Sequence, residues 1–163
     1  MEKFITILYD FIIEYIVRII GMVLVGTVLL QIFTRVFIRV PFSWTDELAR
    51  FAFIWYCFLG SVLTMHKKMH LGIDYFASKM NPKKQYWNRL FVYAMQIVFS
   101  LFLAYYGFKL LSIVGIQKSP IMRVRMKYIY LVLPVSGVLY FILSINETIT
   151  HLKNGKPVLA IKA

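Results

Sequence analysis

Charged residues and histidines mark both ends of one apolar stretch in the middle of the chain. Asp46, Glu47 and Arg50 precede the stretch, and His66 and His70 follow it. Asp46 and Arg50 are four residues apart, a spacing at which a carboxylate and a guanidinium can pair on one helix face. His66 and His70 share this spacing, which can present two imidazoles to one metal ion. The residue types therefore allow a structural clamp of paired charges or a metal site.

The sequence around the histidines favours polar contacts at a membrane surface over a metal site. Two lysines directly follow His66, and their positive charges would compete with a bound cation. A third histidine, His151, is expected on the same side of the membrane, so a three-histidine site is the alternative. Cys57 is the single cysteine and allows no cysteine-based site. We predict no metal, and metal analysis of the purified protein would test this.

The chain lacks the common sequence signatures of catalysis. It contains no G-x-S-x-G, no H-E-x-x-H, no phosphate-binding loop and no C-x-x-C. Serines within the apolar runs have no histidine at comparable depth to act as a base, and in membrane helices serine more often makes packing contacts. We therefore expect neither an enzyme nor a cofactor.

The composition is typical of an integral membrane protein. Of the 163 residues, 60% are hydrophobic, whereas a soluble domain has about 45–50% apolar residues. The net charge of +12 would suggest nucleic acid in a soluble protein. Here the bases lie in short segments between apolar runs, where membrane topology and anionic lipids explain them better. We expect membrane lipids as partners, and no nucleic acid.

The apolar runs predict an all-α integral membrane protein with one membrane domain, residues 1–163. The uncharged residues 51–65 would cross about 22 Å as a helix, less than the bilayer core of about 30 Å. The charged ends of this helix must therefore lie at or just inside the two membrane faces. Pro134 and Gly137 predict a kink in the fourth span. The expected spans are residues 15–37, 46–65, 87–113 and 128–146, with short amphipathic interfacial helices at 1–14 and 70–80.

The distribution of bases predicts the orientation. With four spans, both termini and the segment between the second and third spans lie on one side. That side carries eleven of the 19 lysines and arginines, and the other carries eight. Because cytoplasmic loops carry the excess of positive charge, we expect both termini in the cytoplasm.

The centres of the spans lack groups for a transport pathway. Carriers usually place ionisable residues or broken helices near the membrane midplane. The amides Gln31 and Gln96 within the spans favour interhelical hydrogen bonds over substrate contacts. None of the residues nearest the span centres is ionisable; they are Gly26, Phe58, Phe99 and Gly137.

One pattern of spaced residues resembles a known family. It reads Trp44-x-Asp46-Glu47-x-x-Arg50, then Trp55, Leu59-Gly60 and His70-x-x-x-Asp74. The pattern is similar to the signature of the DctQ-like, or Q, subunit, which is the small membrane subunit of tripartite ATP-independent periplasmic (TRAP) transporters. The chain length and the four-helix layout also fit. Asp46 stands where glutamate is common, which keeps the charge.

The resemblance implies a non-catalytic subunit of the bacterial inner membrane with both termini cytoplasmic. It would scaffold a large many-helix membrane subunit that binds sodium and substrate. A periplasmic binding protein would deliver an acidic solute, such as a C4-dicarboxylate, sialic acid or another sugar acid. Asp46, Glu47 and Arg50 would fix the periplasmic start of the second helix, and His70 and Asp74 its cytoplasmic turn.

We expect the loop of residues 117–127 to contact the periplasmic binding protein. Its bases face the periplasm in the predicted topology, and we expect them to dock an acidic patch of the binding protein; they are Lys118, Arg123, Arg125 and Lys127. The alternative to an accessory subunit is a self-sufficient small carrier or channel that acts as an oligomer. Flux through the chain reconstituted alone would distinguish the two.

Overall fold

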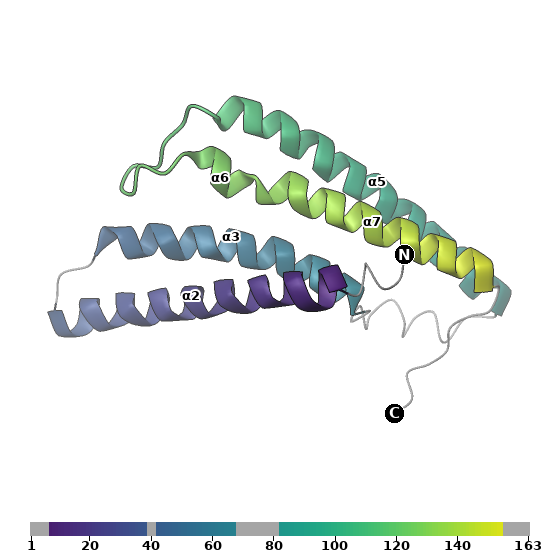
Figure 1. Ribbon diagram of the computed structural model, residues 1–163, viewed down its shortest axis with the longest axis horizontal. Coiled ribbons are helices and arrows are strands. Elements are labelled where there is room, and N and C mark those ends of the chain that lie inside the picture. Colours follow the sequence, from purple (N-terminus) through teal and green to yellow (C-terminus); the bar gives the residue numbers. More distant parts are fainter. Residues whose placement is uncertain (1–6, 39–41, 68–81, 155–163) are drawn as a thin grey trace.

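A computed structural model describes residues 7–38, 42–67 and 82–154, and most of these are helical (Figure 1). Four helical stretches are long and apolar enough to cross a membrane: Leu8–Phe37, Ser43–His66, Trp87–Val114 and Met126–Thr150. The predicted all-α class with four membrane helices is confirmed. The elements in order are η1 (Ile7–Ile13), α2 (Glu14–Phe33), η2 (Thr34–Ile38), α3 (Ser43–His66), α5 (Pro82–Val114), α6 (Met126–Tyr130) and α7 (Val132–Asn154).

The first membrane helix begins earlier than the sequence analysis placed it. The backbone at Ile13 is helical, with φ −68° and ψ −42°, so the π-helical η1 runs directly into α2. Residues 7–14 therefore continue the first membrane helix, whereas we expected a separate interfacial helix at 1–14. The acidic residues of this segment, Asp10 and Glu14, contact residues at the end of α3, as described below. The interfacial helix expected at 70–80 lies outside the described residues.

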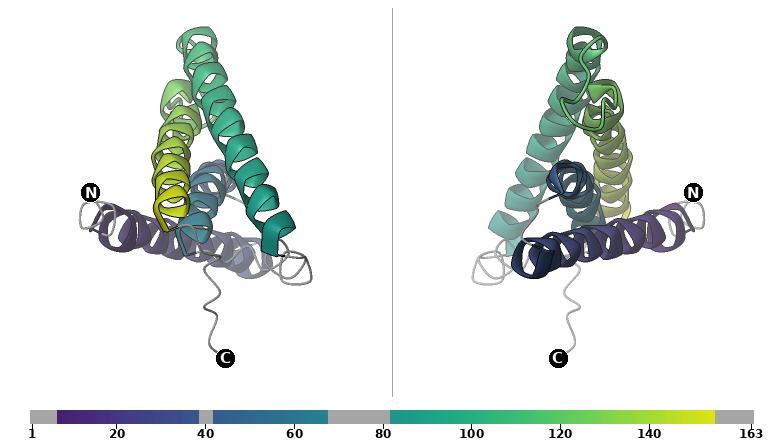
Figure 2. Two further views of the ribbon diagram at one scale, coloured as in Figure 1. Left: turned by 90° about the vertical axis from the view of Figure 1, so that its right-hand side faces the viewer. Right: turned by 90° about the vertical axis from the view of Figure 1, so that its left-hand side faces the viewer.

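The helices form two pairs that meet through α3 and α7. Helix α2 packs on α3, α5 packs on α7, and α3 contacts α7. Figure 2 shows α5 and α7 inclined toward each other as a wedge, with α2 crossing at its base. The large apolar side chains on the outer faces of α2 and α5 are exposed, among them Met22, Leu29, Phe99 and Tyr105. Water rarely meets so continuous an apolar surface in a folded protein, whereas lipid accepts it.

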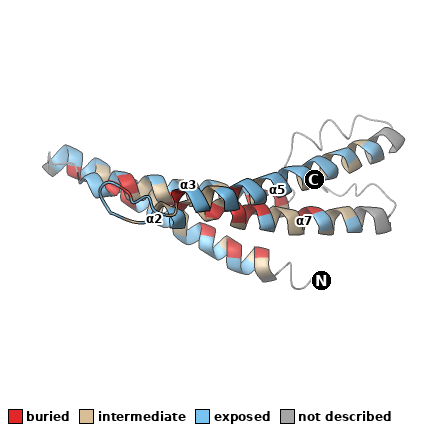
Figure 3. Ribbon diagram, turned by 90° about the horizontal axis from the view of Figure 1, so that it is seen from above, coloured by how far each residue is buried: buried red, intermediate tan, exposed pale blue. Residues whose placement is uncertain are grey.

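The buried core lies where the first helix, α3 and α7 meet. Tyr9, Ile13 and Val17 recur every four residues on one face of the first helix, which is the spacing of a helical stripe. They pack with Leu59, Val62 and Met65 of α3 and with Val132 and Leu143 of α7. Figure 3 shows buried segments alternating with exposed ones along the helices, as expected where one face of each helix packs on its neighbours.

Small residues let α5 and α7 approach closely. A Cβ atom added at Gly137 of α7 would lie 2.6 Å from the backbone nitrogen of Ala104 in α5. A Cβ atom added at Gly107 of α5 would lie 2.7 Å from the nitrogen of Pro134 in α7. Both distances are shorter than real Cβ contacts, so each glycine is required by the neighbouring backbone. Small residues commonly mediate such contacts between membrane helices.

The fourth membrane helix is broken near its start, as Pro134 predicted. Helix α6 ends at Tyr130, Leu131 forms a turn, and α7 begins at Val132. Pro134 has no N–H to donate to the carbonyl of Tyr130, four residues earlier, so the helix loses a bond there. The interruption lies at Leu131, and the kink itself stays a prediction.

Candidate functional site

Asp46 and Arg50 pair at the start of α3, but the pair is exposed in the isolated chain. Nη2 of Arg50 lies 3.2 Å from Oδ2 of Asp46, and the two side chains are 69% and 59% exposed. Nε2 of Gln31 in α2 lies 3.5 Å from Oδ1 of Asp46, a long contact between the helices. An exposed pair within one helix contributes little to stability. Its part in a structural clamp remains a prediction.

Glu47, the next residue after Asp46, binds the loop that precedes α6. Its residue is 7% exposed, and its Oε2 accepts a hydrogen bond of 2.7 Å from the backbone N–H of Met122. A buried carboxylate is costly unless it is hydrogen-bonded, and the loop amide supplies such a bond. The sequence analysis placed Glu47 in the motif but did not predict this partner.

The loop is a tight hairpin, which we call the cationic hairpin (residues 117–125). The N–H of Ser119 donates to the carbonyl of Val124 at 2.8 Å, and the N–H of Met126 donates to that of Gln117 at 2.9 Å. Arg123 has a φ of 53°, a left-handed conformation that reverses the chain. The bases expected to dock a partner are all exposed on the hairpin and the following helix α6; they are Lys118, Arg123, Arg125 and Lys127.

The other residues of the family signature have different surroundings. Trp44 is 42% exposed and stacks on Phe42, with ring centroids 6.4 Å apart. Trp55 is partly buried and packs on the core. A Cβ atom added at Gly60 would meet no atom within 4 Å, so packing within this chain does not require glycine there. His70 and Asp74 lie outside the described residues.

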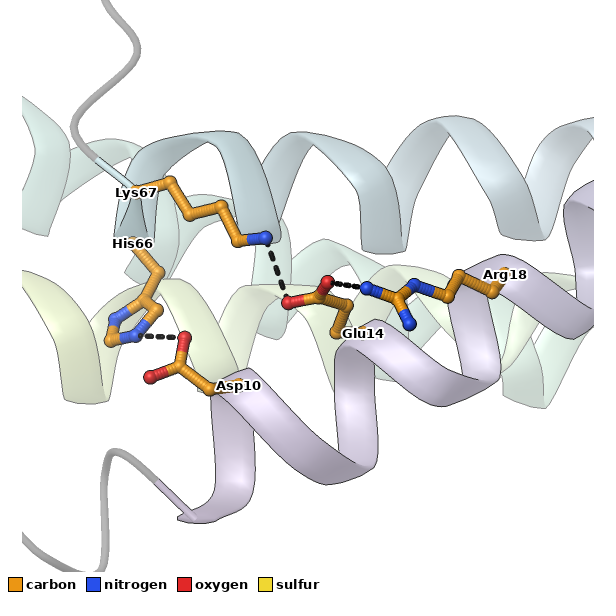
Figure 4. Close-up of polar contacts among 5 residues, drawn as sticks. All are labelled: Asp10, Glu14, Arg18, His66 and Lys67. Carbon is orange, nitrogen blue, oxygen red and sulfur yellow. Dashed lines mark hydrogen bonds and ion pairs between the residues drawn. The ribbon is translucent and has the colours of Figure 1, made fainter.

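A second polar cluster lies at the opposite end of α3, and we call it the polar clasp (Figure 4). Nε2 of His66 lies 3.0 Å from Oδ1 of Asp10, and Nζ of Lys67 lies 2.7 Å from Oε2 of Glu14. Arg18 also pairs with Glu14. The Glu14 side chain is only 16% exposed, so these pairs are partly shielded from solvent. The clasp fastens the first helix to the end of α3.

Tyr9 connects the polar clasp to α7. Its ring stacks on the imidazole of His66, with centroids 5.1 Å apart and planes inclined by 26°. Its hydroxyl donates a hydrogen bond of 2.8 Å to the carbonyl of Leu139. Tyr9 is fully buried, so one side chain joins three helices.

His66 was considered as a metal ligand from the sequence, and in the structure it makes polar and aromatic contacts within the chain. His66 contacts Asp10 and Tyr9, both from the first helix. Among the described residues, no group of three or more His, Cys, Asp or Glu side chains is placed to hold a metal ion. The absence of a metal in the protein remains a prediction, because His70 and the side chain of His151 are not among them.

The four membrane helices and the apolar surface around them define a multi-pass helical membrane protein. Residues 24–154 match the family described as tripartite ATP-independent periplasmic transporters, DctQ component. This match covers most of the chain, which therefore belongs to that family of transporter components. The family predicted from the signature between Trp44 and Asp74 is confirmed.

Three relatives show how the match extends over known proteins. The chain is 24% identical over 131 residues to the sialic acid TRAP transporter permease protein SiaT of Haemophilus influenzae, covering 80% of the chain and 21% of SiaT. It is 34% identical over 53 residues to the sialic acid TRAP transporter small permease protein SiaQ of Vibrio cholerae, covering 32% of the chain and 31% of SiaQ. A second Haemophilus influenzae relative, named as a TRAP transporter small permease protein, is 23% identical over 142 residues, covering 86% of the chain and 85% of the relative. The matched region is thus about a fifth of SiaT and about a third of SiaQ.

Proposed function

We propose that this chain is the non-catalytic small membrane subunit of a TRAP transporter. It scaffolds a large sodium-coupled subunit in the bacterial inner membrane, with both of its own termini in the cytoplasm. The observation that carries the proposal is the DctQ family match over residues 24–154. The match to SiaT supports the large partner, because there the related segment is about a fifth of a longer permease chain.

The arrangement of polar groups supports a scaffold rather than a pathway. The charged contacts described above lie at the two ends of α3, in the polar clasp and at the cationic hairpin. The residues nearest the span centres, such as Phe58 and Phe99, cannot bind a cation or an acid through a charge. Sodium and solute would therefore bind to the large subunit.

The solute proposed for the assembled transporter is an organic acid delivered by a periplasmic binding protein. The names of SiaT and SiaQ support sialic acid within this class, which also includes C4-dicarboxylates and other sugar acids. We place the solute-binding groups outside this chain.

Co-purification tests the proposed function. We expect the tagged full-length chain, co-expressed with the TRAP large permease of the same genome, to retain that permease through size-exclusion chromatography in a one-to-one complex. Liposomes with both chains, supplied with the binding protein, should take up the acidic solute in response to a sodium gradient. Flux through liposomes that contain only this chain would instead support a self-sufficient carrier and would refute the scaffold.

Charge reversal tests docking at the cationic hairpin. We expect Arg123→Glu combined with Arg125→Glu to slow uptake roughly three- to tenfold at low ionic strength, because exposed charges mainly accelerate association. The deficit should shrink as salt rises, since salt screens such charges. Arg35→Glu is the control, because Arg35 is exposed on η2 outside the hairpin. Equal uptake by the double variant and the native complex at every ionic strength would argue against docking here.

A further inference from the structure

We propose that Glu47 is a positioning residue, which holds the cationic hairpin in the orientation that docks an acidic protein surface in the periplasm. The identity of the partner rests on the proposed function. The tether between Glu47 and the hairpin stands on geometry alone.

The first step is the contact itself. Glu47 belongs to the first turns of α3, whereas Met122 lies 75 residues later at the tip of the hairpin. The bond from the N–H of Met122 to the carboxylate is 2.7 Å long, in the range of short charge-assisted hydrogen bonds. The carboxylate is buried beneath the hairpin, and Ser119 of the hairpin is buried as well, at 2% exposure. The underside of the hairpin is therefore seated on α3.

The second step is the division of roles between neighbouring acids. Asp46 is exposed and pairs with Arg50 in its own helix. Glu47 is the next residue, so its side chain leaves the helix in a different direction and reaches another element. The two acids of the signature thus have separate contacts, and only that of Glu47 joins α3 to the hairpin. Exchanging one acid at a time can separate their effects.

The third step is the surface that the tether orients. The hairpin tip exposes Ile121 (49%) and Met122 (37%). The bases Lys118, Arg123 and Arg125 flank this apolar tip, and residues 115–127 contain no acidic residue. Arginine and methionine are enriched in protein interfaces, and a cationic ring around an apolar centre complements an apolar patch edged by carboxylates. The hairpin therefore fits an acidic protein surface.

The tether favours a protein partner over an anionic lipid surface. Attraction of bases to anionic lipid depends on charge near the surface and needs no fixed direction. A fixed direction matters where specific side chains must meet specific pockets, and supporting contacts then hold the binding residues in place. The bond from Glu47 to Met122 and the two bonds across the hairpin supply such support.

The experiment compares Glu47→Ala and Glu47→Gln with the control Asp46→Ala, an exposed acid in the same turn. The full chain is studied in its complex with the large permease, in nanodiscs of neutral lipid. Amide hydrogen exchange of residues 116–126 reports the tether, and the affinity for the binding protein reports docking. We expect Glu47→Ala to speed exchange in the hairpin by about tenfold, since the loss of a supporting contact favours local opening. It should also weaken docking several-fold while the yield of the complex is kept. Glu47→Gln retains an acceptor oxygen and should fall between Glu47→Ala and native. Asp46→Ala should leave the exchange rates of the hairpin at their native values, because Asp46 pairs with Arg50 in its own helix.

The outcomes separate this inference from the proposed function. Unchanged exchange in Glu47→Ala would overturn the tether. Faster exchange with undiminished docking would overturn the positioning role. A third outcome is that the native complex fails to bind the binding protein and binds vesicles containing anionic lipid instead. That result would identify the partner as a membrane surface and overturn the inference. Failure of the chain to associate with any large permease would refute the proposed function, and exchange measured on the chain alone would still test the tether.

Discussion

Replacing Gly137 with alanine should destabilise the protein, even though alanine is the better helix former. A Cβ atom at this position would lie 2.6 Å from the nitrogen and 2.9 Å from the Cα of Ala104. These are backbone atoms, which cannot rotate away as a side chain can, so α5 and α7 would have to separate. Overpacking of this kind costs about 1–3 kcal/mol. Gly107→Ala should act in the same way, because its Cβ would meet Pro134.

Two other glycines provide matched controls. A Cβ atom at Gly26 or Gly60 would meet nothing within 4 Å. Alanine there should leave stability unchanged or raise it, because alanine favours a helix over glycine by about 1 kcal/mol. Thermal unfolding in one detergent, followed by size-exclusion chromatography, would compare the four variants. Equal melting temperatures for Gly137→Ala and Gly60→Ala would show that α5 and α7 do not pack as closely as the structure has them.

The number of membrane helices follows from the sequence because it depends on local properties. An uncharged run such as residues 51–65 must be helical in lipid, since every backbone polar group needs a partner within the segment. The break before α7 was predictable for the same reason, because Pro134 lacks an N–H. These inferences need no knowledge of which helices are neighbours.

The contacts between different elements that build the candidate sites depend on which elements are neighbours, and the sequence analysis did not predict these contacts. The bond between Glu47 and Met122 joins residues 75 positions apart. Predicting it requires knowing how α3 is rotated about its axis and where the hairpin folds back. The signature identified Glu47 as notable but named no partner for it outside α3. The pairing of Asp46 with Arg50 needed no such knowledge, because their spacing within one helix predicts it.

The contact between the two helices in the polar clasp could have been predicted from the membrane topology. Asp10 and Glu14 belong to residues 1–14, for which an amphipathic interfacial helix was expected, and His66 was considered as a metal ligand. The predicted topology already placed these acids on the same side of the membrane as His66 and Lys67. Opposite charges at one end of two helices that follow each other in the chain are natural partners, because such helices usually pack together. The particular pairs depend on how each helix is rotated about its axis, which the sequence does not give.

Tyr9→Ala should be the most damaging single change at the end of α3 that carries the polar clasp. Tyr9 is fully buried, its ring stacks on His66, and its hydroxyl bonds to the carbonyl of Leu139. Removing a buried aromatic ring costs about 3–5 kcal/mol in water-soluble proteins. The cavity and the lost van der Waals contacts persist in a membrane protein, although the solvent is lipid. We expect the first helix to detach from α3 and α7 at this end.

Two further tyrosine variants divide this effect into its parts. Tyr9→Phe keeps the ring and removes the hydroxyl, so it should lose only the bond to Leu139, about 0.5–1.5 kcal/mol. Tyr15→Ala is the control, because Tyr15 is 66% exposed on the same helix and should change stability little. The free energy of unfolding in mixed micelles would rank the variants, and proteolysis near residue 10 would report detachment of the first helix. If Tyr9→Ala and Tyr15→Ala unfold alike, the contact of Tyr9 with α3 and α7 does not hold the helices together. If Tyr9→Phe is as damaging as Tyr9→Ala, the bond to Leu139 outweighs the packing of the ring.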